Sequence, residues 1–180
     1  MITMNINVFV DMDGVLAAYD KDVVSKMYNE GFFLNRPVHQ GNLNLVKNLI
    51  RDKRLNVYIL SSCLADSAYV VPEKNAWLDK YLPELPVENR ILVPEGIAKS
   101  DYIKSVLPNV DSTHNVLIDD YTVNLLKWES DGFIGVKMMN GLNSTNGLWI
   151  ARHPNSVLNY RANPNHNYYK LTKLIMNRIN

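Results

Sequence analysis

Two carboxylates stand one residue apart where an apolar run near the N-terminus ends. The run Ile6 to Val10 leads into Asp11, Met12, Asp13 and Gly14, and the glycine permits a sharp turn. An ionised aspartate can attack phosphorus to form an aspartyl phosphate, while a second one protonates the leaving oxygen and later deprotonates a water. The pattern suggests Asp11 as the nucleophile and Asp13 as the general acid and base. An ordinary solvated turn is the competing interpretation.

A second acidic pair follows another apolar run. Asn115 to Ile118 leads directly into Asp119 and Asp120. Adjacent like charges need a cation, and with Asp11 they would complete an oxygen-rich magnesium site. The alternative is that one of the pair caps the helix expected from Thr122 to Trp128, and one residue could do both.

Hydroxyl groups and lysines are further candidates for binding an anion. Ser61 and Ser62 follow the run that begins at Leu55, where a hydroxyl and backbone amides could bind a phosphate oxygen, although a serine after a strand is commonly a helix cap. Lys74 and Lys99 each stand near the start of an expected helix. A cation is unfavourable there against the helix dipole, so a nearby anionic ligand would explain the position of both lysines. The alternative is that they belong to the solvated surface, as most lysines do.

Strands and helices must alternate to bring these residues together. Short apolar runs rich in branched residues predict buried strands, and stretches with helical spacing lie between them. The expected strands are Ile6 to Val10, Leu55 to Leu60, Arg90 to Val93, Asn115 to Ile118 and Phe133 to Val136. The expected helices are Leu43 to Ile50, Ala76 to Leu82, Ile97 to Leu107, Val123 to Trp128 and Tyr168 to Ile179. The alternation predicts an α/β fold with a doubly wound, Rossmann-like parallel sheet, whose ligands bind beyond the carboxyl ends of the strands.

One domain over residues 1–180 fits this length, with a small cap insert at about residues 15–40. We expect the insert to be helical around Lys21 to Gly31. Its aromatic residues could contact a substrate or pack the insert onto the core; they are Tyr19, Tyr28, Phe32 and Phe33. The segments Asn140 to Asn146 and Arg152 to Asn167 are rich in Asn with Gly or Pro and predict loops.

The composition of the chain indicates which kinds of binding partner and which cellular compartment to expect. A net charge of +1 and the lack of a basic run argue against an extended nucleic-acid partner. No apolar run approaches the roughly 20 residues of a membrane span, which argues against a membrane partner. Cys63 is the single cysteine, and the N-terminus has no signal-peptide pattern. We therefore expect a cytoplasmic protein that binds a small or short ligand.

The ordered motifs resemble those of the haloacid-dehalogenase-like (HAD) phosphatases over roughly residues 5 to 136. The likeness rests on Asp11-x-Asp13-Gly14, the apolar strand ending at Ser61, a lysine in the middle section, and Asp119-Asp120. It implies that Asp11 is the nucleophile, Asp13 the general acid and base, and Ser61 a phosphate ligand.

The same resemblance implies a lysine and a metal. Lys99, with Lys104 as its nearest competitor, would neutralise the nucleophile and the phosphate. Mg²⁺ would contact Asp11, the Asp13 carbonyl and either Asp119 or Asp120.

Within that superfamily, Pro72 to Tyr81 resembles a segment of the 5'(3')-deoxyribonucleotidases, where a lysine placed like Lys74 also touches phosphate. The resemblance implies a Mg²⁺-dependent phosphomonoesterase for (deoxy)nucleoside monophosphates. Alternatives are a phosphatase for a sugar phosphate, a flavin nucleotide or a nucleic-acid 3'-phosphate, a non-catalytic module that binds phosphoryl ligands, and an assembly protein that docks through the insert. A homodimer whose second subunit completes the shallow cap also stays open.

Overall fold

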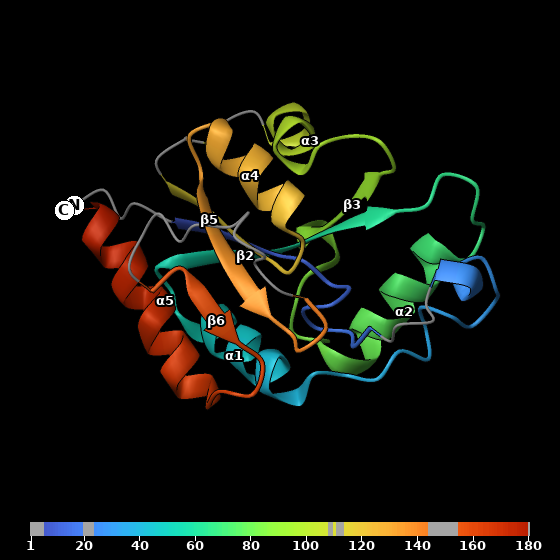
Figure 1. Ribbon diagram of the computed structural model, residues 1–180, viewed down its shortest axis with the longest axis horizontal. Helices are drawn as coiled ribbons and strands as arrows, with labels where there is room; N and C mark the ends of the chain where they lie inside the picture. The colour runs from blue at the N-terminus through green and yellow to red at the C-terminus, as the bar shows by residue number, and fades with distance from the viewer. Residues whose placement is uncertain (1–5, 20–23, 108–109, 111–113, 144–154, 180) are drawn as a thin grey trace.

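A parallel sheet forms the centre of the molecule in the computed structural model (Figure 1), which describes residues 6–19, 24–107, 110, 114–143 and 155–179. Within these residues the sheet has six strands in the order β3-β2-β1-β4-β5-β6, and every pairing is parallel. The strands are β1 (Ile6–Val10), β2 (Leu55–Cys63), β3 (Arg90–Pro94), β4 (Asn115–Asp119), β5 (Ile134–Met139) and β6 (Val157–Asn159). The predicted doubly wound α/β fold is confirmed.

Helices cover both faces of the sheet, as right-handed crossovers require. They are α1 (Gln40–Arg51), α2 (Val70–Tyr81), α3 (Lys99–Val106), α4 (Thr122–Ser130) and α5 (Pro164–Ile179), with short 3-10 turns η1 (Val24–Lys26) and η2 (Val87–Asn89). Leu49 of α1, Trp77 of α2 and Leu171 of α5 belong to one buried cluster, whereas Ile103 of α3 and Trp128 of α4 belong to another. Among the described helices, none combines the length and apolar character needed to cross a membrane.

The loop predicted over Arg152 to Asn167 is wrong where the structure describes it. β6 and the first turn of α5 both lie within that segment. A strand of three residues is too short to show a period. The helix begins at Pro164, which has no N–H to leave unpaired, and the Asn163 side chain accepts a 2.9 Å hydrogen bond from the Asn165 N–H. Asn and Pro, taken as loop signals, here cap a helix.

The segment between β1 and α1, expected as the cap insert, contains less helix than predicted. In its described part the helix expected around Lys21 to Gly31 is limited to the single 3-10 turn η1, followed by turns up to Asn35. Residues 20–23 lie outside the described residues. A carboxylate from α2 fixes the turns, because Glu73 accepts hydrogen bonds from the N–H groups of Gly31, Phe33 and Leu34 at 2.5, 2.9 and 3.2 Å.

Removing this carboxylate should loosen the insert. Glu73→Ala leaves three N–H groups without their acceptor, and we expect the free energy of unfolding to fall by about 2 kcal/mol. Urea denaturation measures the loss, and limited proteolysis should show earlier cleavage between α1 and β1. The matched control is Glu88→Ala, because Glu88 is exposed. Equal stabilities for the two variants would contradict the anchoring role.

Candidate active site

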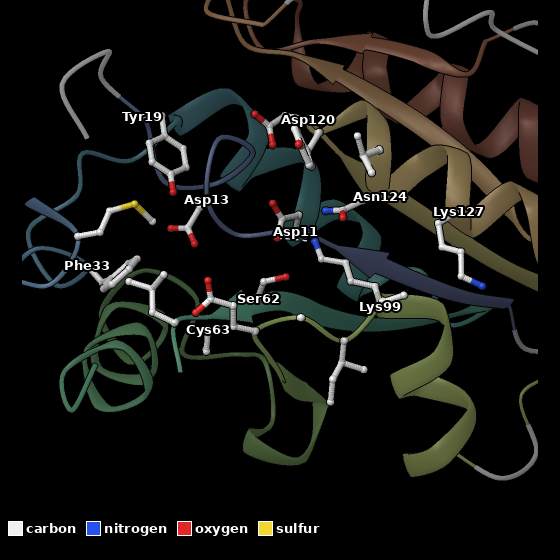
Figure 2. Close-up of a pocket in the computed structure, with 18 residues that line it drawn as sticks. Asp11, Asp13, Tyr19, Phe33, Ser62, Cys63, Lys99, Asp120, Asn124 and Lys127 are labelled. Atoms are coloured by element: carbon white, nitrogen blue, oxygen red, sulfur yellow. Dashed lines mark hydrogen bonds and ion pairs between the residues drawn. The ribbon is translucent and has the colours of Figure 1, made fainter. Parts of the chain in front are cut away.

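The carboxyl ends of β1, β2 and β4 deliver polar side chains to one edge of the sheet. A cavity of about 620 Å³ opens there, lined by Asp11, Asp13, Ser62, Lys99 and Asp120 among others (Figure 2). The clustering follows from the parallel topology, because neighbouring strands end at the same edge. The predicted meeting of these side chains is thus seen in the structure.

Lys99 joins two of the acids. It is buried at the start of α3, and its Nζ donates to Asp11 Oδ1 at 2.7 Å and to Asp119 Oδ2 at 2.6 Å. Asp119 is fully buried and also accepts hydrogen bonds from the Tyr121 N–H at 2.8 Å and from Asn124 Nδ2 at 3.0 Å. The carboxylates raise the pKa of Lys99 against the effect of its burial, so its ammonium stays charged.

Asp120, the third acid, is held by an asparagine. Asn140 Nδ2 donates to Asp120 Oδ2 at 2.8 Å and to the Gly14 carbonyl at 3.0 Å. Gly14 has φ +78°, and a Cβ at this position would lie 2.3 Å from Asp120 Oδ2. Glycine is therefore required at position 14 for two reasons: its backbone conformation and the close approach of Asp120.

Oxygen atoms of Asp11, Asp119 and Asp120 lie within 4.8 Å of one another. Burial, followed by the neighbouring charges, raises the pKa of Asp120 to about 8, and burial raises that of Asp11 to about 7 although Lys99 opposes it. When all three carboxylates are ionised, one lysine leaves an excess of negative charge, which a hard divalent cation would offset. This donor set fits Mg²⁺.

Asp13 faces a different cation. Its Oδ2 lies 2.5 Å from Lys74 Nζ, which also donates to Ser61 Oγ at 2.9 Å and to the Ser62 carbonyl at 2.6 Å. Lys74 and Ser61 are fully buried behind Asp13, with the Phe33 ring 5.0 Å from the ammonium. Ser62 is the serine of the pair that lines the cavity. In this arrangement Lys74 and Ser61 support Asp13, and their contact with phosphate stays a prediction.

The remaining candidates separate by position. Tyr19 and Phe33 line the cavity, whereas Phe32 packs edge-to-face on Phe33 at 4.8 Å and against Arg36. Lys104 lies one turn beyond Lys99 on α3, pairs with Asp131 at 3.6 Å and rests over the Phe133 ring. The geometry therefore favours Lys99 over Lys104 as the lysine beside Asp11.

Comparison with known proteins gives a fold but no sequence relative. No family model matches the chain, and no curated protein does. A HAD-like family hydrolase from Streptococcus pneumoniae superposes with a TM-score of 0.61 at 10% identity, over 92% of this chain and 97% of that one. The D,D-heptose 1,7-bisphosphate phosphatase of Burkholderia thailandensis gives 0.55 at 13% identity, over 94% and 99%.

A third structure carries ligands. A HAD family enzyme from Bacteroides thetaiotaomicron, in complex with magnesium and inorganic phosphate, superposes with a TM-score of 0.53 at 14% identity, over 81% of this chain and 100% of that one. The fold is that of the HAD-like hydrolases. None of the three superpositions points to the deoxyribonucleotidases in particular.

On this HAD-like fold, several polar residues escaped the sequence analysis. Asn143 Nδ2 donates to the carbonyls of Asp120 and Met138 at 3.0 and 2.8 Å, and the Lys137 ammonium donates to the Asp120 carbonyl and, at 2.9 Å, to Thr122 Oγ1. These residues, like Asn140, belong to β5 and the loop after it. The Asn-rich composition correctly predicted a loop at 140–143, but it contains no signal for contacts with Asp120. Asn146, at the end of the predicted loop, lies outside the described residues.

The raised pKa of Asp120 predicts how the metal-free site affects stability. From about pH 4 to about pH 8 folded Asp120 keeps a proton that the unfolded chain has released, so its contribution to stability is present at low pH and is lost as pH rises. In EDTA, the unfolding free energy of the wild type relative to Asp120→Asn should fall by on the order of 2 kcal/mol across this range. Urea melts at several pH values measure this difference.

The prediction would be contradicted if the wild type and Asp120→Asn differed in unfolding free energy by the same amount at every pH from about 4 to about 8. Excess Mg²⁺ should restore the wild type at about pH 8 by binding the folded state alone. It should restore Asp120→Asn less, because that variant lacks one of the three carboxylates.

Proposed function

We propose that this protein is a Mg²⁺-dependent phosphomonoesterase that acts through an aspartyl phosphate on Asp11. The observation that supports it most is the convergence of the Asp11, Asp119 and Asp120 carboxylates on one edge of the cavity, with Lys99 between two of them and Asp13 nearby. Phosphoryl transfer needs such an arrangement, because most of its catalysis is positioning and charge stabilisation.

In the proposed first step, Asp11 attacks phosphorus in line while the bond to the leaving oxygen breaks. Asp13, on the same loop, gives its proton to that oxygen. Lys99 holds the Asp11 carboxylate in place and offsets phosphate charge through its ammonium. Bound Mg²⁺, held by Asp11, Asp119 or Asp120 and the Asp13 carbonyl, would supply further charge neutralisation.

In the second step a water attacks the phosphorus of the aspartyl phosphate. Asp13 takes a proton from that water, inorganic phosphate leaves, and Asp11 is again a carboxylate. Lys74 lies 2.5 Å from Asp13 Oδ2, so it can stabilise Asp13 each time the carboxylate is charged. Uncatalysed phosphate monoesters react so slowly that these effects together must supply on the order of 20 kcal/mol.

The proposed substrates are (deoxy)nucleoside monophosphates. A cavity of about 620 Å³ is within the usual range for a ligand of this size. The insert contributes the partly exposed Tyr19 and Met27 to its wall, so apolar surface is available beside the charged floor. The likeness of Pro72 to Tyr81 to the deoxyribonucleotidases supports the same choice.

Phosphate release from a substrate panel tests the proposal. The panel holds deoxy- and ribonucleoside monophosphates, sugar phosphates, flavin mononucleotide and an oligonucleotide with a 3'-phosphate, each with Mg²⁺ and with EDTA. Selective, Mg²⁺-dependent release from nucleotides supports the full proposal. Release from other esters alone keeps the phosphatase and rejects the nucleotidase, whereas binding without release from any of them indicates a binding module.

A further inference from the structure

The two sides of the cavity differ in what their aromatic side chains already contact. On the insert side, Phe33 is only 1% exposed and packs against the Lys74 ammonium. Figure 2 shows the Tyr19 hydroxyl pointing toward the Asp13 carboxylate. Phe32 is engaged by Phe33 and Arg36. These rings are already used in holding the insert and the Asp13 region.

The other side of the cavity has apolar side chains that are open to solvent, beside the polar Asn124 and Lys127. Ile97 is 45% exposed, Tyr121 60% and Val123 56%, and all three line the cavity. They come from two separate segments, the loop before α3 and the start of α4. Exposed apolar side chains scattered singly are ordinary, but three that border one charged cavity form a surface for an apolar part of its ligand.

Tyr121 is the best placed of the three. Its backbone N–H donates to Asp119 Oδ1 at 2.8 Å, so its Cα is fixed beside the acidic cluster, while its ring remains largely exposed. A ligand whose phosphate meets Asp11 and Lys99 would extend its leaving group past this side of the cavity. An aromatic group there could stack on the Tyr121 ring and cover the Ile97 and Val123 side chains.

We propose that Tyr121, together with Ile97 and Val123, binds the leaving group, and that the substrates are phosphate monoesters with an aromatic leaving group. The inference rests on the proposed function and deepens it. It assigns recognition of the leaving group to the side of the cavity formed by the loop before α3 and the start of α4, and not to Tyr19, Phe32 and Phe33 of the insert. Tyr121 would be a specificity-determining residue without a part in the chemistry.

Binding of two inert phosphonates tests this assignment separately from catalysis. Calorimetry with Mg²⁺ compares naphthylmethylphosphonate with ethylphosphonate on the wild type, Tyr121→Ala, Tyr121→Phe and the control Tyr169→Ala. Tyr169 is 61% exposed on α5 and matches Tyr121 in type and exposure. The wild type should prefer the aromatic ligand about tenfold, and Tyr121→Ala alone should lose most of that preference, because stacking and burial together are worth about one power of ten in affinity.

Each outcome decides the matter. The proposal is supported if Tyr121→Phe and Tyr169→Ala keep the preference for the aromatic phosphonate and Tyr121→Ala loses it. No preference in the wild type, or an equal loss for both phosphonates in Tyr121→Ala, overturns it. Hydrolysis of naphthyl phosphate and glycerol phosphate by the same proteins separates the two proposals. If neither ester is turned over, the phosphatase activity is rejected, while the phosphonate affinities still test whether Tyr121 binds the aromatic group.

Discussion

Asp11→Asn should abolish Mg²⁺-dependent phosphate release, with an expected loss of at least about 10⁴-fold in kcat. The amide is nearly isosteric with the carboxylate and can still accept the hydrogen bond from Lys99, which in the wild type is 2.7 Å long. It cannot act as an anionic nucleophile, so the first step is lost while the fold stays. Phosphate release from the best substrate of the panel, with saturating Mg²⁺, measures the effect.

The control for this variant is Asp66→Asn. Asp66 is an exposed aspartate between β2 and α2, so the same chemical change there should leave kcat within about twofold. Mass spectrometry of protein quenched during turnover adds a direct readout, since the phosphoryl group should be found on Asp11. Undiminished release by Asp11→Asn, or a phosphoryl group on another residue, would reject the assignment of the nucleophile.

Much of the fold was predictable because the strands are buried on both faces and therefore read as short apolar runs. All residues of β4, from Asn115 to Asp119, are buried. The acids after β1 and β4 could be assigned to one site because parallel strands place their carboxyl ends at one edge. Asp11 and Asp119 are 108 residues apart in sequence, yet the sheet topology places both of them in contact with Lys99.

Other parts of the site depend on contacts that no local pattern encodes. Lys74 was expected to meet phosphate because it stands near a helix start, yet it is fully buried against Asp13 and Ser61. Asn140 reaches Gly14 across 126 positions of sequence, and only the pairing of β4 with β5 brings its loop to the acidic cluster. Side-chain direction and burial decide such roles, and neither follows from residue type alone.

Lys99→Met should give the largest loss of stability among single changes in this site when metal is absent. The thioether side chain fills similar space but leaves Asp11 and Asp119 buried together without their shared cation. Removing one partner from a buried charge pair costs about 3–5 kcal/mol. Urea denaturation in EDTA measures the loss at about pH 8, which is above the pKa of about 7 that Asp11 has beside Lys99. At this pH the wild type keeps the Asp11 carboxylate charged, whereas the variant must either bury that charge without its cation or take up a proton.

The same helix offers a matched control in Lys104→Met. Lys104 is half-exposed and its pairing with Asp131 at 3.6 Å crosses the surface, so this change should cost less than about 1 kcal/mol. The destabilisation of Lys99→Met should shrink at about pH 5, where the carboxylates can take up protons instead, and saturating Mg²⁺ should reduce it at about pH 8. If the two lysine variants lose the same stability in EDTA, Lys99 does not neutralise the acidic cluster, and the electrostatic basis of the proposed site fails with it.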